Sequence, residues 1–399
     1  MPAGYLITVL LLGVGTCCAL WPPGAASPRN RPSIRSRWSV AAYLIGMTFN
    51  EAPLFPLLLG VAATAFAIGE GDVSAPMGTA AVGGMAFVAA GLVWVAVRAV
   101  RSRGVPAAAL DACLGGGWRA ALRGEASAVA GRGTVVAVLF LPFRRRRRDV
   151  QRISGLRYGE WGRENTLDLY LPRRRPAKGP VFVHFHGGRF VSGAKNRESL
   201  YLLYRLASHG WTCVSANYRL APAARFPDYV VDAKRVLFWV KTHGAAYGAG
   251  TGPVVVAGNS AGAFLAAFTA LTPGRTELQP GFEDADTTVA AAVCLYGYYG
   301  RVQGTNPDST PAAYANPAAP PFLLLHGDRD SVVSVDHGRD FARTLAGISR
   351  QPVIWCRLPG AQHSFDYFAS VRARFAAEDI EGFADWAQAR NAQGTGSGD

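Results

Sequence analysis

Three long apolar runs occupy the first hundred residues of the chain, with polar and charged residues gathered between them. A helix needs about 20 apolar residues to cross the hydrocarbon core of a bilayer, and each run is close to or beyond that length. The pattern therefore predicts an N-terminal membrane segment, 1–104, that contains about three transmembrane helices, at 3–21, 52–69 and 77–98.

The first run has two interpretations. Residues 3–20 contain no charged side chain and are followed by Trp21, an aromatic residue of the kind found at membrane interfaces. A secretory signal peptide would also place an apolar run here, but it carries Lys or Arg before the run and a small-x-small cleavage site after it. Neither feature is evident in the sequence, so we favour a retained helix.

The second run starts at Trp38 and is interrupted by Asn50, Glu51 and two prolines. We interpret 54–68 as the span and the part before it as an interfacial helix or a broken half-helix. An acidic side chain in the hydrocarbon is costly. We therefore expect Glu51 to lie at an interface or to pair inside the bundle, either as a boundary or packing residue or as a functional one.

The arginines orient these helices. The formal net charge is +14, of which +12 lies up to Arg175 (21 basic minus 9 acidic residues) and +2 after it (20 minus 18). Arginines lie between the first two runs and after the third, whereas the loop between the second and third runs carries only Glu70 and Asp72. Because cytoplasmic loops are enriched in Lys and Arg, we expect a multi-pass protein of the cell membrane whose C-terminal domain is cytoplasmic.

A basic juxtamembrane linker is expected over 105–149. Its apolar stretch 134–143 is short for a span and leads into Arg144, Arg145, Arg146, Arg147 and Arg148. We expect this stretch to dip into the cytoplasmic interface while the arginines meet anionic lipid headgroups. The alternatives are a solvated charge run beside an ordinary buried strand, or a further crossing, which would place the C-terminal domain outside.

After residue 150 the pattern changes to short apolar runs that alternate with amphipathic stretches. The expected strands are 153–159, 165–172, 181–185, 211–218, 253–257, 289–296, 321–326 and 352–358, and the expected helices are 198–208, 227–243, 261–271, 334–346 and 366–389. Such alternation predicts an α/β domain over 150–390, with a mostly parallel sheet covered by helices on both faces. The residues from 391 to 399 are expected to form a disordered tail.

Composition excludes two functional classes. The excess basic charge has neither the interleaved aromatic residues nor the zinc-finger spacing of a nucleic-acid-binding surface, so no nucleic-acid partner is expected. The six cysteines have no CxxC or Cys/His metal spacing, and three of them lie in runs that are typical of buried strands. Neither a disulfide framework nor a metal site is predicted.

One stretch, Gly258-Asn259-Ser260-Ala261-Gly262, follows an expected strand and precedes an expected helix. It matches G-x-S-x-G, in which a serine sits at a sharp strand-to-helix turn and small residues two positions away avoid a collision. A surface turn would also be rich in Gly and Ser. The functional interpretation makes Ser260 a nucleophile, with the first amides of the following helix directed at it.

Three further polar clusters follow expected strands. They are His186-Gly187-Gly188-Arg189-Phe190, His326-Gly327-Asp328-Arg329-Asp330 and Gly360-Ala361-Gln362-His363-Ser364-Phe365. Ligands bind at the carboxyl ends of parallel strands, so these clusters are expected to meet Ser260 at one edge of the sheet. The order Ser260, Asp330, His363 is that of a catalytic triad on such a fold.

These motifs resemble those of α/β-hydrolases, over 150–390. Asn217-Tyr218-Arg219-Leu220-Ala221-Pro222, followed by Phe226-Pro227 and Asp232, is similar to the hormone-sensitive-lipase-like esterase family. With its membrane segment, the chain resembles the membrane-associated carboxylesterases of actinobacteria. The resemblance implies Ser260, Asp330 and His363 as catalytic residues, with an oxyanion hole at Gly187, Gly188, Arg189 and Ala261, and with no metal or organic cofactor.

The sequence departs from the family pattern at three points. The usual HGGG has Arg189 in its last position, the usual GDSAG has Asn259, and the acidic residue that often follows YRLAP is Ala223. Any residue except proline offers a backbone amide, so Arg189 can still donate to an oxyanion. Its side chain could either alter the charge of the pocket or point to solvent, and we favour the second. Asp328 is the rival catalytic acid, although we expect it to order the turn.

The implied activity is that of a membrane-anchored serine carboxylesterase or lipase that hydrolyses acyl esters, lipids among them, through an acyl-enzyme. The stretch 300–320, rich in Pro, Ala and Tyr, is a candidate wall of the substrate pocket. The sequence leaves two alternatives. The same triad could hydrolyse an amide or peptide, or the domain could be a catalytically silent binding module, although a silent module would be expected to lack a member of the triad.

Overall fold

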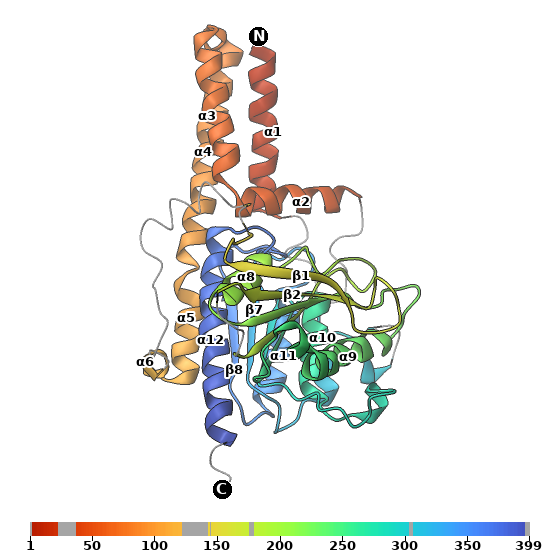
Figure 1. Cartoon of the computed structure of the whole chain (residues 1–399). Helices are drawn as coiled ribbons and strands as arrows, with labels where there is room; N and C mark the ends of the chain where they lie inside the picture. Colours follow the sequence, from red (N-terminus) through yellow and green to blue (C-terminus); the bar gives the residue numbers. More distant parts are fainter. Residues whose placement is uncertain are drawn as a thin grey trace.

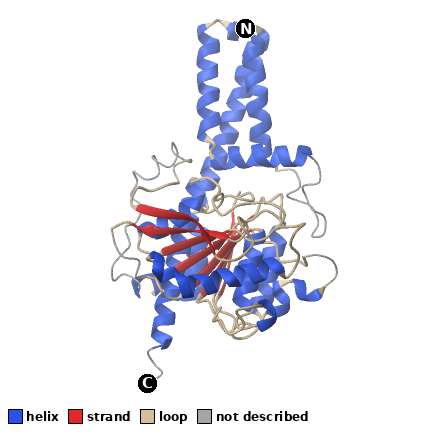
Figure 2. Ribbon diagram, turned by 45° about the vertical axis from the view of Figure 1, so that its right-hand side comes forward, coloured by secondary structure: helices blue, strands red, loops and turns tan. Residues whose placement is uncertain are grey.

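The computed structural model describes residues 2–22, 37–121, 143, 145–174, 179–302 and 306–395. A bundle of apolar helices stands on one side of an α/β domain, and one further helix lies crosswise between the two (Figure 1). The same arrangement is visible from a second direction in Figure 2, where the sheet occupies the middle of the α/β domain.

The bundle consists of α1 (Pro2–Leu20), α3 (Leu54–Gly69) and α4 (Pro76–Arg101). Small residues allow the helices to approach closely: a Cβ at Gly91 would lie 2.7 Å from Thr16, and a Cβ at Gly60 would lie 2.1 Å from Met85. The bundle core is small and apolar, with Leu92 fully buried. Tight packing through glycine is typical of helices that associate within a bilayer.

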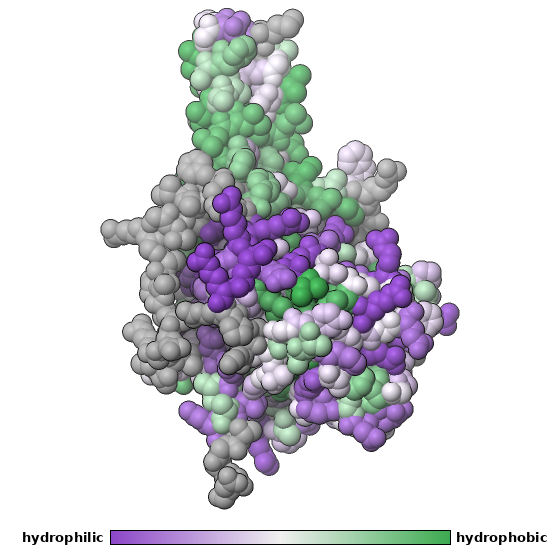
Figure 3. Space-filling model, in the orientation of Figure 1, coloured by the Kyte–Doolittle hydropathy of each residue, from purple (hydrophilic) through white to green (hydrophobic). Residues whose placement is uncertain are grey.

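The outer surface of the bundle is also apolar. Its exposed side chains include Ile7, Leu10, Leu11, Val14, Leu58, Leu59, Val61, Phe66, Phe87, Val93 and Trp94. Figure 3 shows this hydrophobic surface beside the mainly hydrophilic visible face of the α/β domain. By length and composition, Ala3–Leu20 and Pro76–Leu114 could each cross a membrane, and a bent helix pair could provide a third span.

The bent pair is α2 (Arg37–Glu51) followed by α3, with an angle of 86° between the apolar helices Val40–Glu51 and Leu54–Gly69. The bend comes at Pro53, since proline removes a backbone donor and restricts the residue before it. The second apolar run is thus broken, as the sequence predicts, into a helix that lies across the α/β domain and a helix of the bundle (Figure 1).

The α/β domain is built on one eight-stranded sheet in the order β1-β2-β4-β3-β5-β6-β7-β8. Its strands are β1 (Val150–Arg157), β2 (Thr166–Pro172), β3 (Val181–Phe185), β4 (Thr212–Ala216), β5 (Val254–Asn259), β6 (Ala291–Leu295), β7 (Phe322–Gly327) and β8 (Val353–Leu358). Strand β2 is antiparallel to both of its neighbours, β1 and β4. The remaining neighbours, in the sheet order β4-β3-β5-β6-β7-β8, are all parallel. The predicted α/β fold is confirmed.

Helices cover both faces of this sheet. On one face the core includes side chains of α9 (Asp228–His243), α10 (Ala261–Leu271) and α11 (Val335–Ala346). On the other it includes side chains of α8 (Leu200–Ser208) and α12 (Val371–Thr395). Because the central strands are buried on both sides, they are continuous apolar runs without alternation. Helix α12 extends five residues past the boundary expected at 390.

The prediction of a linker over 105–149 is wrong for the first part of that range. Residues Gly104–Leu114 form α5 and Trp118–Ala121 form α6. Leu110 and Trp118 are buried in the same core as α12, and a Cβ at Gly382 would lie 3.0 Å from the Trp118 ring. These two helices are short and rich in small residues, so their apolar pattern in the sequence is weak. They are buried only because they pack on α12 and β8.

The rest of that stretch is described only in part. Most of 134–143 and Arg144 lie outside the described residues. Phe143 makes edge-on ring contacts with Phe55 of α3 and with Phe368, at 5.4 and 5.6 Å between centroids. Arg145 donates to the carbonyl oxygen of Tyr367 at 3.0 Å. The chain therefore passes between the bundle and the α/β domain immediately before β1.

Candidate active site

Ser260 occupies the turn between β5 and α10. Its φ of 54° and ψ of −113° form a backbone conformation that residues other than glycine rarely adopt. The neighbouring glycines permit this turn. A Cβ at Gly258 would lie 2.1 Å from the carbonyl oxygen of Gly262, and a Cβ at Gly262 would lie 2.0 Å from that of Phe185. The stretch GNSAG therefore forms a tight strand-to-helix turn of the G-x-S-x-G type, with Ser260 at its apex.

The loop after β3 lies against this turn. A Cβ at Gly187 would be 3.1 Å from the Cβ of Ser260. Gly188, Arg189 and Phe190 all have positive φ, at 123°, 57° and 61°, and strained backbone of this kind is concentrated at functional sites. The Arg189 side chain is exposed and that of Phe190 is buried. The loop thus brings a series of backbone amides close to the serine.

The amides of this loop do not all have the same role. The Gly187 amide donates to Oε2 of Glu198 at 2.5 Å, which corrects the expectation that it belongs to an oxyanion hole. Within the described part of the chain, the amides of Gly188 and Arg189 have no protein acceptor. Ala261 begins α10, where the first amides of a helix lack intrahelical partners. Three predicted donors therefore remain near Ser260.

The predicted acid and histidine meet above the ends of β7 and β8. Nδ1 of His363 lies 2.7 Å from Oδ2 of Asp330, and the two residues are only 6% and 3% exposed. The rival Asp328 points elsewhere. Its Oδ1 accepts the Gly360 amide at 2.7 Å, so Asp328 orders the turn that carries His363. Of the two carboxylates, Asp330 is the one that contacts the histidine.

The surroundings of Asp330 keep it ionised. Burial alone would raise the pKa of this carboxyl, but the charge of His363 and the hydrogen bonds of His326 and His363 outweigh burial and hold its pKa far below the ordinary range. Oδ1 also accepts the amides of Val332 and Val333, each at 2.8 Å. A carboxylate fixed in this way orients an imidazole through a single hydrogen bond.

Sequence reasoning missed the contact of His326 with Asp330. Nε2 of His326 lies 3.1 Å from Oδ2 of Asp330, and both side chains are buried. No partner motif in the sequence marks His326. The available signal was its position four residues before Asp330 at the end of the same strand, which brings the two side chains to one side of the turn.

Ser260 and His363 face the same part of the sheet edge. The Ser260 amide donates to the carbonyl oxygen of Leu295 at 2.9 Å, and the next residue, Tyr296, packs against the ring of His363 at 4.6 Å between centroids. No hydrogen bond joins Ser260 Oγ to His363 within the described residues. Catalytic hydrogen bonds are commonly long in ligand-free enzymes and shorten when the substrate binds.

Comparison with known proteins identifies the family of this chain. The family model BD-FAE matches residues 167–303. The probable carboxylic ester hydrolase LipM of Mycobacterium tuberculosis is 35% identical over a match that covers 90% of this chain and 89% of LipM. The esterase LipQ of the same organism is 34% identical, covering 65% of this chain and 68% of LipQ. This chain belongs to the α/β-hydrolase carboxylesterases. It is a carboxylic ester hydrolase.

Solved structures agree with the fold of this carboxylesterase. Esterase B from Lactobacillus rhamnosis, in a crystal structure inhibited by a tributyrin phosphonate, has a TM-score of 0.54 at 19% identity, covering 72% of this chain and 98% of the esterase. At that identity the likeness concerns the fold alone. The match to LipM, by contrast, covers so much of the chain that it includes part of the N-terminal helical segment.

Behind Ser260 of this carboxylesterase lies a buried polar network. Asn259 donates through Nδ2 to Asp366 at 2.8 Å and accepts through Oδ1 from Ser199 at 3.0 Å. His184 bonds to the same Oδ1 at 2.6 Å, and the Tyr296 hydroxyl donates to Asp366 at 2.5 Å. The uncharged Asn259, which departs from the family's usual aspartate, is therefore paired with a carboxylate supplied by Asp366.

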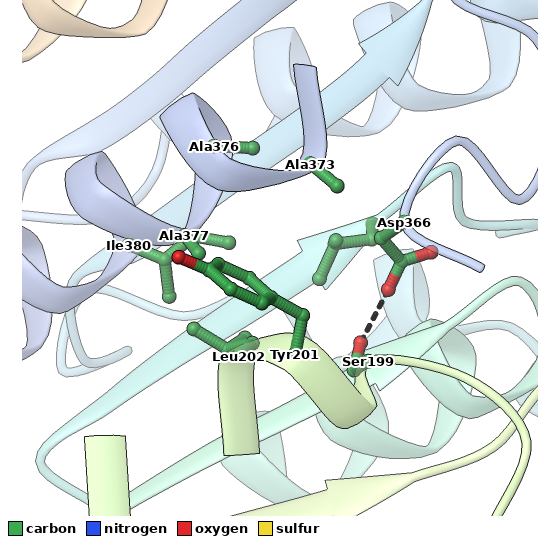
Figure 4. Close-up of a pocket in the computed structure, with 9 residues that line it drawn as sticks. Ser199, Tyr201, Leu202, Asp366, Ala373, Ala376, Ala377 and Ile380 are labelled. Carbon is green, nitrogen blue, oxygen red and sulfur yellow. Dashed lines mark hydrogen bonds between the residues drawn. The ribbon is translucent and has the colours of Figure 1, made fainter. Parts of the chain in front are cut away.

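The same network reaches a small pocket behind the site. Figure 4 shows the hydrogen bond from Ser199 to Asp366, 2.5 Å long, beside side chains of α8 and of the start of α12. The pocket is lined mostly by apolar side chains, and Ser260, Asp330 and His363 are absent from its lining. It is thus separate from Ser260, Asp330 and His363.

The remaining motif residues are structural. Asp232 accepts both the amide and Nε of Arg219, each at 2.9 Å, which fixes the chain after β4. His186 stacks on Tyr218 at 4.5 Å between centroids, and burial lowers the pKa of His186 to about 4. A neutral, stacked imidazole that bonds to the Gly187 carbonyl oxygen shapes the glycine loop. No group of His, Cys, Asp or Glu side chains able to hold a metal ion occurs among the described residues.

Proposed function

We propose that this carboxylesterase is anchored in a membrane and hydrolyses acyl esters through Ser260, His363 and Asp330. The observation that carries the proposal is the 2.7 Å contact between His363 and Asp330, made at the sheet edge where the strained turn presents Ser260. A carboxylate that orients an imidazole, and an imidazole that can accept the proton of a serine, are the groups used for nucleophilic acyl transfer.

The mechanism follows from the properties of these groups. His363 takes the proton of Ser260, and the serine oxygen attacks the ester carbonyl. Asp330, an acceptor only, keeps a proton on Nδ1 of His363, leaves Nε2 free to act as the base, and stabilises the imidazolium that forms. The amides of Gly188, Arg189 and Ala261 stabilise the oxyanion. His363 then protonates the alcohol leaving group, and water hydrolyses the acyl-enzyme by the same steps.

Membrane anchoring rests on the apolar surface of the bundle and on the position of the site. The side chains that cover α1, α3 and α4 would be poorly solvated in water. Helix α2 joins this bundle and contacts the His363 loop, so the catalytic edge of the sheet faces the bundle. Acyl esters held in or near a bilayer are therefore the substrate class that we favour, with residues of 300–320 as a wall of their pocket.

The basic residues support a cytoplasmic α/β domain. Arg98, Arg101 and Arg103 lie where α4 reaches that domain, which fits the enrichment of arginine on the cytoplasmic side. In the run before β1, Arg146 and Arg148 are exposed, and we propose that they contact anionic headgroups. Arg145 and Arg147 instead contact Tyr367 and Asp149 of the protein itself.

The direct test is the variant Ser260→Ala, which removes the nucleophile and adds no bulk. We expect hydrolysis of a soluble ester such as p-nitrophenyl butyrate by the purified full-length protein in detergent to fall to the background of the buffer. Ser154→Ala, which alters an exposed serine of the edge strand β1, is the control and keeps its activity. Hydrolysis retained by Ser260→Ala would overturn the assignment. An anilide of matched acyl chain, tested in parallel, separates esterase from amidase activity.

A further inference from the structure

The loop that carries His363 is contacted by a helix from outside the α/β domain. It runs from Pro359, after β8, to Ser370, before α12. Helix α2, which comes some 300 residues earlier in the sequence, lies across this end of the domain (Figure 1). Its side chains contact the loop at its beginning, its middle and its end.

The first two contacts are hydrogen bonds to the loop backbone. Near the beginning, Nδ2 of Asn50 donates to the carbonyl oxygen of Gly360 at 2.9 Å. In the middle, the Tyr43 hydroxyl donates to the carbonyl oxygen of His363 itself at 3.4 Å. The Tyr43 ring lies edge-on to the imidazole, at 6.4 Å between centroids. Both donors come from the N-terminal segment, and both acceptors belong to the catalytic loop.

The third contact is a buried ion pair. Glu51, the last residue of α2, pairs with Arg372, and the two side chains are 0% and 1% exposed. Oε2 of Glu51 also accepts the hydroxyl of Ser370 at 2.7 Å. Arg372 in turn donates to the carbonyl oxygen of Pro359 at 3.5 Å. The pair therefore connects the end of α2 to both ends of the His363 loop.

The α/β domain holds the loop from the opposite side. Asp328 accepts the amide of Gly360, and Asp330 contacts Nδ1 of His363. The carbonyl oxygens of Gly360 and His363 are left for α2. The loop is thus held between the end of β7 and a helix of the membrane segment.

We infer that α2 is a positioning element of the active site, in which Asn50 and Glu51 fix the loop that places His363 over Ser260. The inference rests on the proposed role of His363 and extends it to residues of the N-terminal segment. A membrane tether needs only a covalent connection, whereas a buried ion pair is retained at a cost in desolvation. A displacement of about 1 Å at a catalytic group can lower the rate about a hundredfold.

The test compares full-length variants in detergent. Glu51→Gln removes the buried charge and keeps the shape. Asn50→Leu removes the bonds from Nδ2 to the Gly360 carbonyl oxygen and to Oε1 of Glu51, and it leaves the charged pair of Glu51 and Arg372 in place. Two controls match them. Glu381→Gln, on α12, breaks a partly buried contact with Arg205 of α8, and Thr64→Val removes a hydroxyl that bonds only within the bundle. Active sites are counted by stoichiometric labelling with a fluorophosphonate, and kcat is expressed per labelled site with p-nitrophenyl butyrate as substrate.

A positioning role predicts a loss of kcat per labelled site of about tenfold or more in Glu51→Gln and Asn50→Leu, with slower labelling. KM for the small ester should stay within about twofold of the parent value, since Asn50 and Glu51 are both buried against the protein. Both controls keep kcat per site within about twofold. A merely structural role would lower the number of sites that can be labelled and leave kcat per site unchanged.

Several outcomes would overturn the inference. Unchanged kcat per site in both α2 variants would do so, and so would equal losses in the controls. If Glu51→Gln fails to fold, Asn50→Leu decides, because it leaves no buried charge unpaired. Failure of the proposed function is a separate result: it would appear as hydrolysis by Ser260→Ala, whatever the α2 variants show.

Discussion

Replacing Asp330 with asparagine keeps the size of the side chain and removes its charge. Oδ1 of the new amide can still accept the amides of Val332 and Val333, which now lie 2.8 Å from the carboxylate. Its NH₂ group, however, would face Nδ1 of His363, where Asp330 accepts at 2.7 Å. A donor at that place favours the tautomer with its proton on Nε2, the nitrogen that must act as the base.

The expected loss follows from that change of tautomer. In a Ser-His-Asp triad, the wrong tautomer lowers kcat by about 10⁴-fold, although the geometry is intact. This corresponds to about 5 kcal/mol of transition-state stabilisation. Because Asp330 also accepts from His326, Asp330→Asn is expected to lower the melting temperature as well. The loss in kcat must therefore be measured per folded, labelled active site.

The assay is hydrolysis of p-nitrophenyl butyrate at pH 8, beside Asp328→Asn as the matched control. Asp328 accepts the Gly360 amide and does not contact the imidazole, so Asp328→Asn should lose less than about tenfold. The reasoning is refuted if Asp330→Asn keeps more than a tenth of the parent kcat. It is also refuted if Asp328→Asn is the more damaging of the two, which would make Asp328 the catalytic acid.

Three further predictions concern the turn, the pH dependence and the topology. Gly262→Ala places a Cβ 2.0 Å from the Phe185 carbonyl oxygen, and it should lower the free energy of unfolding by about 3 kcal/mol or more. The control Gly347→Ala, whose new Cβ would have its nearest atom at 3.6 Å, should leave that free energy nearly unchanged. Equal losses of stability for the two variants in urea unfolding would contradict this prediction. Burial, followed by the nearby charge of Asp366, raises the pKa of Glu198 to about 7. The folded protein therefore favours the protonated form of Glu198. The resulting contribution to the free energy of unfolding, up to about 3 kcal/mol, is fully present below pH 4.5 and is lost as the pH rises through 7. Glu198→Gln should flatten that decline, and an unchanged slope would exclude Glu198 as its source. Reporter fusions after Arg103 and after Arg148 should both give cytoplasmic signals, whereas an external signal after Arg148 would mean that the intervening chain crosses the membrane.

Local motifs of the active site could be predicted because short-range sterics determine them. The turn at Ser260 needs small residues two positions away on each side, and the collisions at Gly258 and Gly262 show why. The alternation of strands and helices was equally predictable, since strands buried on both faces are unbroken apolar runs. The contact between Asp330 and His363 followed from the chain order of a triad and from the rule that parallel strands end at one edge.

Contacts between distant parts of the chain could not be predicted. Ser199 and Asp366 are 167 residues apart, and Glu51 and Arg372 are 321 residues apart. No spacing or periodicity connects such pairs. Glu51 was expected at an interface or paired within the bundle. The structure pairs it with a residue of the α/β domain, because α2 bends away from α3 and lies over the catalytic loop.

The misassigned linker has a related cause. Helices α5 and α6 contain few large apolar side chains, and their pattern alone is typical of a connecting segment. Their burial depends on α12, where Gly382 leaves room for the ring of Trp118. Weak amphipathic helices of this kind are stabilised mostly by tertiary packing, which the sequence of the helix does not contain.

We propose that Ser260 is the nucleophile of a membrane-anchored carboxylesterase. The most direct measurement is peptide mass spectrometry of the full-length protein after reaction with a fluorophosphonate. A single phosphonyl adduct on the peptide that contains Ser260, absent from Ser260→Ala and much slower to form in His363→Ala, is the predicted result. An adduct on another serine, with hydrolysis persisting in Ser260→Ala, would contradict the account.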